Sequence, residues 1–202
     1  MPFILQQASS QKKTIFYTLT SAAPHTGVSF VVCKTAQNYA KQGKKVLIFD
    51  ALLGLKNYPL HNPNQNKISA VLDGLTPLTE LIMPQQKNID VITGMSNCNI
   101  SAIPHANQQR IKNDLQQLAS NYDVVLIDLP SSITSSIFSD YENIQWVSTA
   151  DQTILLKTLK KIAPFSNPSL ILNQVKNHEE RNASHLFIKN LVPQCQIIDF
   201  FE

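Results

Sequence analysis

The stretch that decides the fold is Thr14–Asn57, which reads TIFYTLTSAAPHTGVSFVVCKTAQNYAKQGKKVLIFDALLGLKN. It contains an apolar strand, a loop of small residues, a helix that stops at Gly43, and a second apolar strand that leads to Asp50. These elements together predict a parallel βαβ unit. In such units the first strand-to-helix loop normally holds phosphate, because backbone N–H groups and the helix N-terminus converge there.

Strand and helix patterns alternate along the rest of the chain. We expect strands at Thr14–Leu19, Val46–Phe49, Ile89–Ile92, Val124–Ile127, Ile144–Val147, Leu170–Leu172 and Ile197–Ile198. Helical patterns cover Gln108–Ser120, Ile154–Ile162 and Glu179–Asn190, with two short ones around Ile68–Leu72 and Leu78–Ile82. The alternation predicts an α/β fold, a doubly wound and mostly parallel sheet of about seven strands with helices on both faces. Residues 14–202 then form a single domain, and residues 1–13 form an N-terminal arm or short helix.

Composition excludes several classes of function. The 17 basic and 14 acidic residues are spread through the chain and leave a net charge of +3, so no basic block indicates nucleic acid or an anionic membrane surface. The three cysteines, Cys33, Cys98 and Cys195, are widely spaced and fit unpaired thiols in a reducing compartment. With no export signal and no apolar run long enough to span a membrane, we expect a cytoplasmic protein.

Polar residues follow several of the predicted strands. Ser21, His25, Asp50, Asp128 and Asn173 all lie where the carboxyl ends of parallel strands meet, which is the ligand crevice of such a fold. In a phosphate-binding α/β protein, carboxylates there reach Mg²⁺ or the attacking water. The alternative is that each aspartate only caps its following loop by local hydrogen bonding. Position alone leaves both interpretations open.

The motifs around these residues resemble a known family. VLIFDALLGLKN, YDVVLIDLPSSIT and STADQT, in this order, are similar to motifs of the MinD/ParA group of P-loop ATPases, and most of all to its flagellar branch, FlhG (FleN). The matching residues are Asp50, Ala51, Leu53, Gly54, Leu55 and Asn57, then Tyr122, Asp123, Asp128 and Pro130, then Thr149, Asp151 and Thr153. The resemblance implies a P-loop NTPase-like fold and binding of ATP with Mg²⁺.

The same resemblance implies roles for individual residues. Gly27, Ser29 and Asn173 would contact the nucleotide, with Asn173 at the adenine, and Ser29, Asp50 and Asp128 would hold Mg²⁺. If the protein is active, Asp50 and Asp128 would be its catalytic residues.

The N-terminal arm carries a further match. FlhG proteins resemble one another in a DQAS-type helix that activates the flagellar GTPase FlhF, and Gln6-Gln7-Ala8-Ser9 is similar to that motif with Gln6 in place of the aspartate. The resemblance implies that Gln7, Ala8 and Ser9 bind this partner. The alternative is a polar arm without a partner.

The phosphate loop departs from the family pattern. Aligned without gaps, Ala23 replaces the signature lysine, Val28 replaces the P-loop lysine, and Pro24 removes one backbone N–H from the phosphate cradle. Charge-assisted contacts to phosphate are worth roughly 1.5–3 kcal/mol each, so losing the lysine alone weakens triphosphate binding about ten- to a hundredfold. Leu52 falls where the family has a water-positioning aspartate, and Ser131 or Ser132 falls where it has a switch glycine.

Two other cations could replace the lysine, although neither is favoured. His25 is mostly neutral at pH 7, and Lys34 lies well inside the helix.

These observations predict a degenerate MinD/FlhG-like protein without efficient ATP hydrolysis, which acts by protein contacts in the regulation of flagellar assembly, number or placement. The alternatives are a divergent but active MinD/ParA-type ATPase that positions another cellular machine, and an interaction domain with an unrelated partner. The sequence stops at IIDFFE, so we expect no C-terminal amphipathic helix and no stable membrane anchor. Without the signature lysine we expect a monomer or a nucleotide-independent oligomer.

Overall fold

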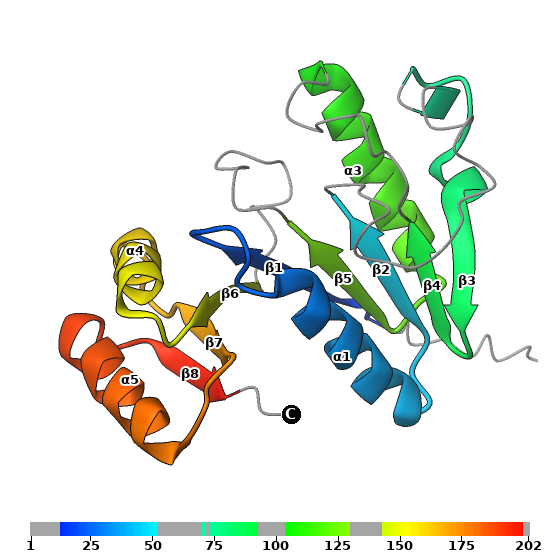
Figure 1. The fold of residues 1–202 in the computed structure, drawn as a ribbon. Coiled ribbons are helices and arrows are strands. Elements are labelled where there is room, and N and C mark those ends of the chain that lie inside the picture. The colour runs from blue at the N-terminus through cyan, green and yellow to red at the C-terminus, as the bar shows by residue number, and fades with distance from the viewer. Residues whose placement is uncertain (1–12, 52–69, 72, 93–103, 130–142, 200–202) are drawn as a thin grey trace, which may run out of the picture.

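The protein forms an eight-stranded, mostly parallel sheet flanked by helices (Figure 1). The computed structural model describes residues 13–51, 70–71, 73–92, 104–129 and 143–199. The strand order is β3-β4-β2-β5-β1-β6-β7-β8. All neighbouring strands pair in parallel except β3, which is antiparallel to β4. The predicted α/β class and doubly wound sheet are confirmed.

The elements follow the predicted order. The strands are β1 (Ile15–Ser21), β2 (Val46–Asp50), β3 (Ile82–Gln86), β4 (Ile89–Ile92), β5 (Val124–Asp128), β6 (Ile144–Thr149), β7 (Ser169–Asn173) and β8 (Gln196–Asp199). The helices of the described ranges are α1 (Val28–Lys41), α3 (His105–Ala119), α4 (Gln152–Ile162) and α5 (His178–Leu191), and η2 (Leu78–Leu81) is a 3₁₀ turn. None of the helices in these ranges has the length and apolar character needed to span a lipid bilayer.

Alternate side chains of the central strands supply the two faces of the core. Val46 and Ile48 of β2 pack with α1, while Leu47 and Phe49 pack with α3 on the other face. Each of the five residues of β2 is buried, as is each of those of β5, which is why both strands read as continuous apolar runs. A third cluster joins α4 and α5 to β7. Helices therefore cover both faces of the sheet, as predicted.

The number of strands differs from the prediction because of β3. The helical pattern around Leu78–Ile82 is only the single 3₁₀ turn η2, and the chain then continues as an edge strand. Pro84 lies within this strand, because proline is tolerated in edge strands, where a missing N–H costs little. The register shifts between Pro84 and Gln86. Of the other short helical pattern, Ala70 and Val71 are helical and the remainder lies outside the described residues.

The last strand is tied to the last helix by an ion-pair cluster. Asp199 of β8 accepts hydrogen bonds from Arg181 Nε at 2.8 Å and lies 2.6 Å from Arg181 Nη2. Its other oxygen lies 2.6 Å from His185 Nε2. Burial opposes ionisation of Asp199, but the hydrogen bonds and charges of Arg181 and His185 outweigh it and hold the carboxyl pKa below the ordinary value of 3.8.

Replacing Asp199 with asparagine is expected to destabilise the protein in a pH-dependent way. Because the folded-state pKa of Asp199 is lowered, its stabilising effect is fully present above the unfolded-state pKa and disappears as the pH falls through the folded-state pKa. We expect Asp199→Asn to cost about 1 kcal/mol at pH 7, a value discounted because Arg181 is 35% exposed. Urea unfolding from pH 7 down to about pH 3 measures it, and a loss that does not shrink with acid would contradict this role.

Candidate functional site

The loop between β1 and α1 lies at the carboxyl edge of the sheet, as predicted. It contains two left-handed backbone positions, His25 with φ of 61° and Gly27 with φ of 83°. Gly27 is the N-cap of α1 and supplies no side-chain cap. The N-terminus of α1 thus faces the loop without a side-chain cap from its N-cap residue, and backbone N–H groups at a helix N-terminus attract anions.

Asn173, at the end of β7, holds this loop in place. Its Nδ2 donates a hydrogen bond of 2.9 Å to the carbonyl oxygen of Thr26, and its side chain is buried. A Cβ added to Gly27 would lie 2.4 Å from the same Nδ2 atom. The residue expected at the adenine therefore contacts the loop itself. Gln174, which follows with φ of 59°, approaches the same glycine.

The residues that replace the two family lysines pack into the protein. Val28, in the first turn of α1, is partly buried against the apolar cluster that includes Val31 and Val32. Ala23 is 8% exposed, and its carbonyl accepts a hydrogen bond of 2.7 Å from Ser21 Oγ. Pro24 is exposed on the loop. No lysine or arginine stands in the described loop, residues 22–27.

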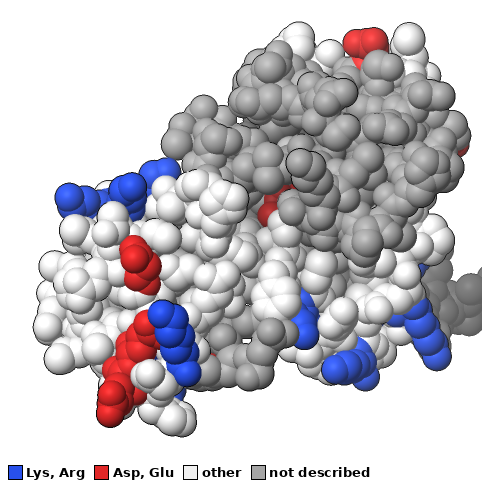
Figure 2. Space-filling model, viewed as in Figure 1, with Lys and Arg blue, Asp and Glu red and all other residues white. Residues whose placement is uncertain are grey.

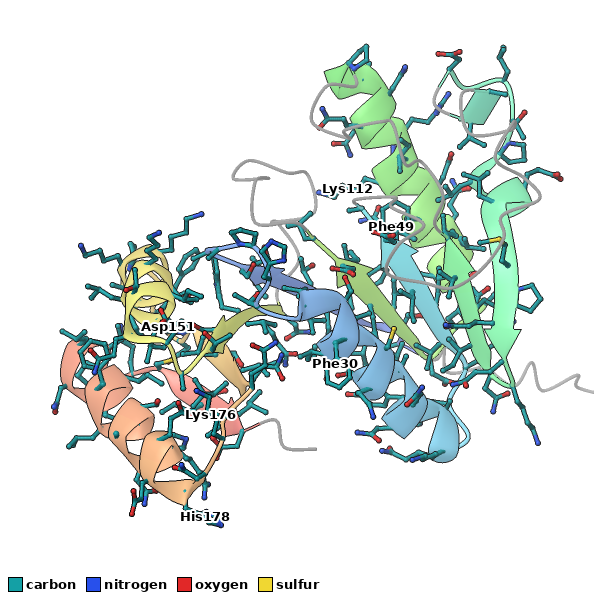
Figure 3. The ribbon with its side chains drawn as sticks, in the orientation of Figure 1. Phe30, Phe49, Lys112, Asp151, Lys176 and His178 are labelled. Carbon is teal, nitrogen blue, oxygen red and sulfur yellow. The ribbon has the colours of Figure 1, made fainter. Side chains whose placement is uncertain are left out.

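The two alternative cations lie in different places, Lys34 on α1 and His25 on the loop itself. Lys34 extends along its own helix, where its ammonium lies 5.3 Å from the ring centre of Phe30. Figure 3 shows Phe30 projecting from α1. His25 is exposed at its left-handed position.

Asp50 and Asp128 are brought together. They end β2 and β5 and are register partners in adjacent strands, whose spacing is about 4.8 Å. Both are buried, at 0% and 1% exposure. Two adjacent buried carboxylates repel each other unless a cation or proton compensates them. Ser29 lies in the first turn of α1 and is partly exposed, so these three residues offer the oxygen ligands that Mg²⁺ prefers.

The third matching motif has a local structural role. Asp151 is the N-cap of α4, and its Oδ1 accepts a hydrogen bond of 3.0 Å from Ile154 N (Figure 3). The hydroxyl of Thr149 accepts one of 3.3 Å from Asp151 N. These contacts are the capping interactions that local hydrogen bonding favours.

The residues present fit a nucleotide only in part. The carboxylate pair and Ser29 suit Mg²⁺, and the uncapped helix N-terminus suits an anion. The described loop offers no side-chain cation for a triphosphate, and Val28 is packed with apolar neighbours. In the described ranges, no group of three or more histidine, cysteine or acidic residues could hold a metal ion by itself. The described residues therefore offer oxygen ligands for Mg²⁺ and a helix N-terminus for an anion, and residues 22–27 contain no lysine or arginine.

Several predicted residues lie outside the described part of the chain. These are Gln7, Ala8 and Ser9 of the arm, Leu52 and the motif residues after it, Pro130, Ser131 and Ser132. Sequence reasoning missed the buried Thr26, whose Oγ1 has no hydrogen-bond partner among the described residues, and the approach of Gln174 to Gly27. The sequence could have indicated Gln174, because it directly follows Asn173, which was a predicted site residue.

The protein has a P-loop NTPase-like α/β fold. This class is defined by the sheet order, the strand–loop–helix unit at the carboxyl edge of the sheet and the paired carboxylates. No protein-family model matches the sequence. The chain is 24% identical to the septum site-determining protein MinD of Bacillus subtilis (strain 168) over 198 residues, 89% of this chain and 72% of that protein.

Two solved structures have the same fold. The MinC:MinD cell division protein complex of Aquifex aeolicus matches with a TM-score of 0.69 and 18% identity over 92% of this chain and 81% of that chain. A candidate plasmid partition protein of Borrelia burgdorferi B31 bound to AMPPNP matches with a TM-score of 0.67 and 18% identity, over 94% and 86% of the two chains. The likeness to these structures shows a shared fold, and the sequence is similar to that of a MinD protein.

Replacing Gly27 with alanine is expected to destabilise the protein more than the same change at Gly43. Both glycines are left-handed, with φ of 83° and 78°, so both changes cost about 1 kcal/mol of backbone strain. Only at Gly27 does the new Cβ displace Asn173 Nδ2 and break its bond to Thr26, which adds about 1 kcal/mol. Urea unfolding compares the two variants. Equal losses would show that the Asn173 contact contributes nothing.

Proposed function

We propose that this protein is a degenerate MinD/FlhG-like protein that keeps the P-loop NTPase fold, lacks efficient ATP hydrolysis, and acts through contacts with other proteins. The observation that carries the proposal is the packing of Val28 against the apolar cluster under α1. A lysine at that position contacts the β- and γ-phosphates. A partly buried valine offers no charge there, and Pro24 offers no N–H.

A regulatory role in flagellar assembly, number or placement is the finer part of the proposal. It is supported by the motifs around Asp50 and Asp128, which are most similar to the flagellar branch, and by the Gln7-Ala8-Ser9 motif. The flagellar GTPase FlhF is the proposed partner. The similar MinD of Aquifex aeolicus occurs in a complex with MinC, which supports a protein partner in general.

The second candidate is a divergent but active MinD/ParA-type ATPase that positions another cellular machine. Asp50 and Asp128 favour it, because they stand side by side and buried where this fold places Mg²⁺ ligands. The AMPPNP held by the similar Borrelia burgdorferi protein is compatible with it.

Calorimetric titration with ATP and Mg²⁺, together with phosphate release, separates the two candidates. We expect the natural chain to bind ATP weakly and to release no phosphate above background. Val28→Lys restores the missing charge and is expected to tighten ATP binding at least about tenfold, whereas Val28→Met, a matched long apolar side chain, is not. Micromolar binding with magnesium-dependent hydrolysis by the natural chain would overturn the proposal, and an unchanged Val28→Lys would favour the active alternative.

A pull-down with the purified flagellar GTPase tests the partner. We expect the full chain to retain FlhF and a chain that starts at Gln11 to lose it, because the proposed contact residues lie in residues 7–9. Circular dichroism of both chains controls for folding. Absence of binding, or binding that is the same without residues 1–10, counts against the flagellar assignment.

A further inference from the structure

A hollow of about 490 Å³ lies at the amino-terminal edge of the sheet, opposite the phosphate-loop edge. Its walls are the C-terminal turn of α1 and the turn between β3 and β4. The lining residues are Gln37, Ala40, Lys41, Gly43, Gln86, Lys87 and Asn88. Because α1 has 14 residues and rises 1.5 Å per residue, this hollow lies about 20 Å from Gly27. It is therefore separate from the candidate nucleotide site.

The charged residues that line the hollow are all basic. Lys41 and Lys87 line it, both are exposed, and no acidic residue is among its lining residues. Lys44 follows Gly43 directly and is exposed as well. Figure 2 shows basic side chains over the end of α1 and near the β3–β4 turn, with no acidic side chain visible between them.

The acidic residue Asp90, near the hollow, already has partners within the protein. The Asp90 carboxylate accepts a hydrogen bond of 2.8 Å from the Tyr122 hydroxyl and lies 4.0 Å from the Lys45 ammonium. That ammonium also lies 4.6 Å from the ring centre of Tyr122. Lys45 is thus part of the fold's own contacts. Neither Lys41 nor Lys87 forms an ion pair with another residue of the described ranges.

The remaining lining groups narrow the class of ligand. Three side-chain amides, from Gln37, Gln86 and Asn88, can donate and accept hydrogen bonds with an extended peptide. Among the described residues no aromatic side chain lines the hollow, so they offer no platform for stacking bases. It also has no large apolar side chain to insert into a lipid surface. The described lining thus consists of ammonium and amide donors without aromatic or large apolar side chains, and such donors suit the carboxylates of a peptide.

We propose that this hollow binds an acidic peptide segment of a partner protein, with Lys41 and Lys87 as its charge contacts. The inference rests on the proposed function only in taking a protein as the partner. Its test uses neither a flagellar protein nor ATP, so either proposal can fail without the other. Partly exposed ion pairs are screened by salt, so binding weakens as ionic strength rises.

Fluorescence anisotropy of labelled hexaglutamate with the full chain tests the site. We expect saturable binding that the double variant Lys41→Glu with Lys87→Glu weakens at least about tenfold. The matched control is Lys157→Glu with Lys160→Glu, which changes net charge equally on exposed positions of α4 and is expected to change binding by less than about threefold. Thermal unfolding checks that both variants fold.

Three results would overturn the proposal. Absence of saturable binding would remove the site. Equal weakening by both double variants would show attraction by net charge alone. Tighter binding of a short DNA duplex that is lost in the Lys41→Glu, Lys87→Glu chain would assign the hollow to nucleic acid instead.

Discussion

Parallel pairing of β2 with β5, both buried on both faces, is the constraint on which the rest of the structure depends. Because each strand contributes alternate residues to the two sides of the sheet, the pair anchors α1 on one side and α3 on the other. The same register brings Asp50 beside Asp128 at the carboxyl edge. Burial of these apolar strands thus determines where the polar side chains Asp50 and Asp128 lie.

The candidate site is a loop at the carboxyl edge of the sheet that contains no lysine or arginine in residues 22–27. Its backbone retains the left-handed Gly27 and the uncapped helix N-terminus. The side chains next to the loop, by contrast, take part in packing and internal hydrogen bonds. Val28 packs against an apolar cluster, and Asn173 donates a hydrogen bond to Thr26. Backbone shape and side-chain charge are therefore separate properties of this loop, because the left-handed Gly27 is present while residues 22–27 contain no lysine or arginine.

Sequence reasoning predicted the central strands well because each is a continuous apolar run ending in a polar residue, as in Val46–Asp50. It predicted that Asp50 and Asp128 would meet, because parallel strands end at one edge. It missed β3, since a short edge strand with Pro84 carries neither an apolar run nor clean alternation. The bond from Asn173 to Thr26 joins residues 147 positions apart, and no local pattern encodes such a contact.

The edge strand β3 has a consequence for how copies of the chain meet. An exposed sheet edge normally offers a row of backbone groups on which another strand can grow. In β3 the exposed Pro84 has no N–H to contribute, and the pairing with β4 is irregular between Pro84 and Gln86. Proline and an irregular register are features that make an edge strand a poorer template for a further strand. The backbone of β3 thus disfavours strand-by-strand association of copies at this edge of the sheet.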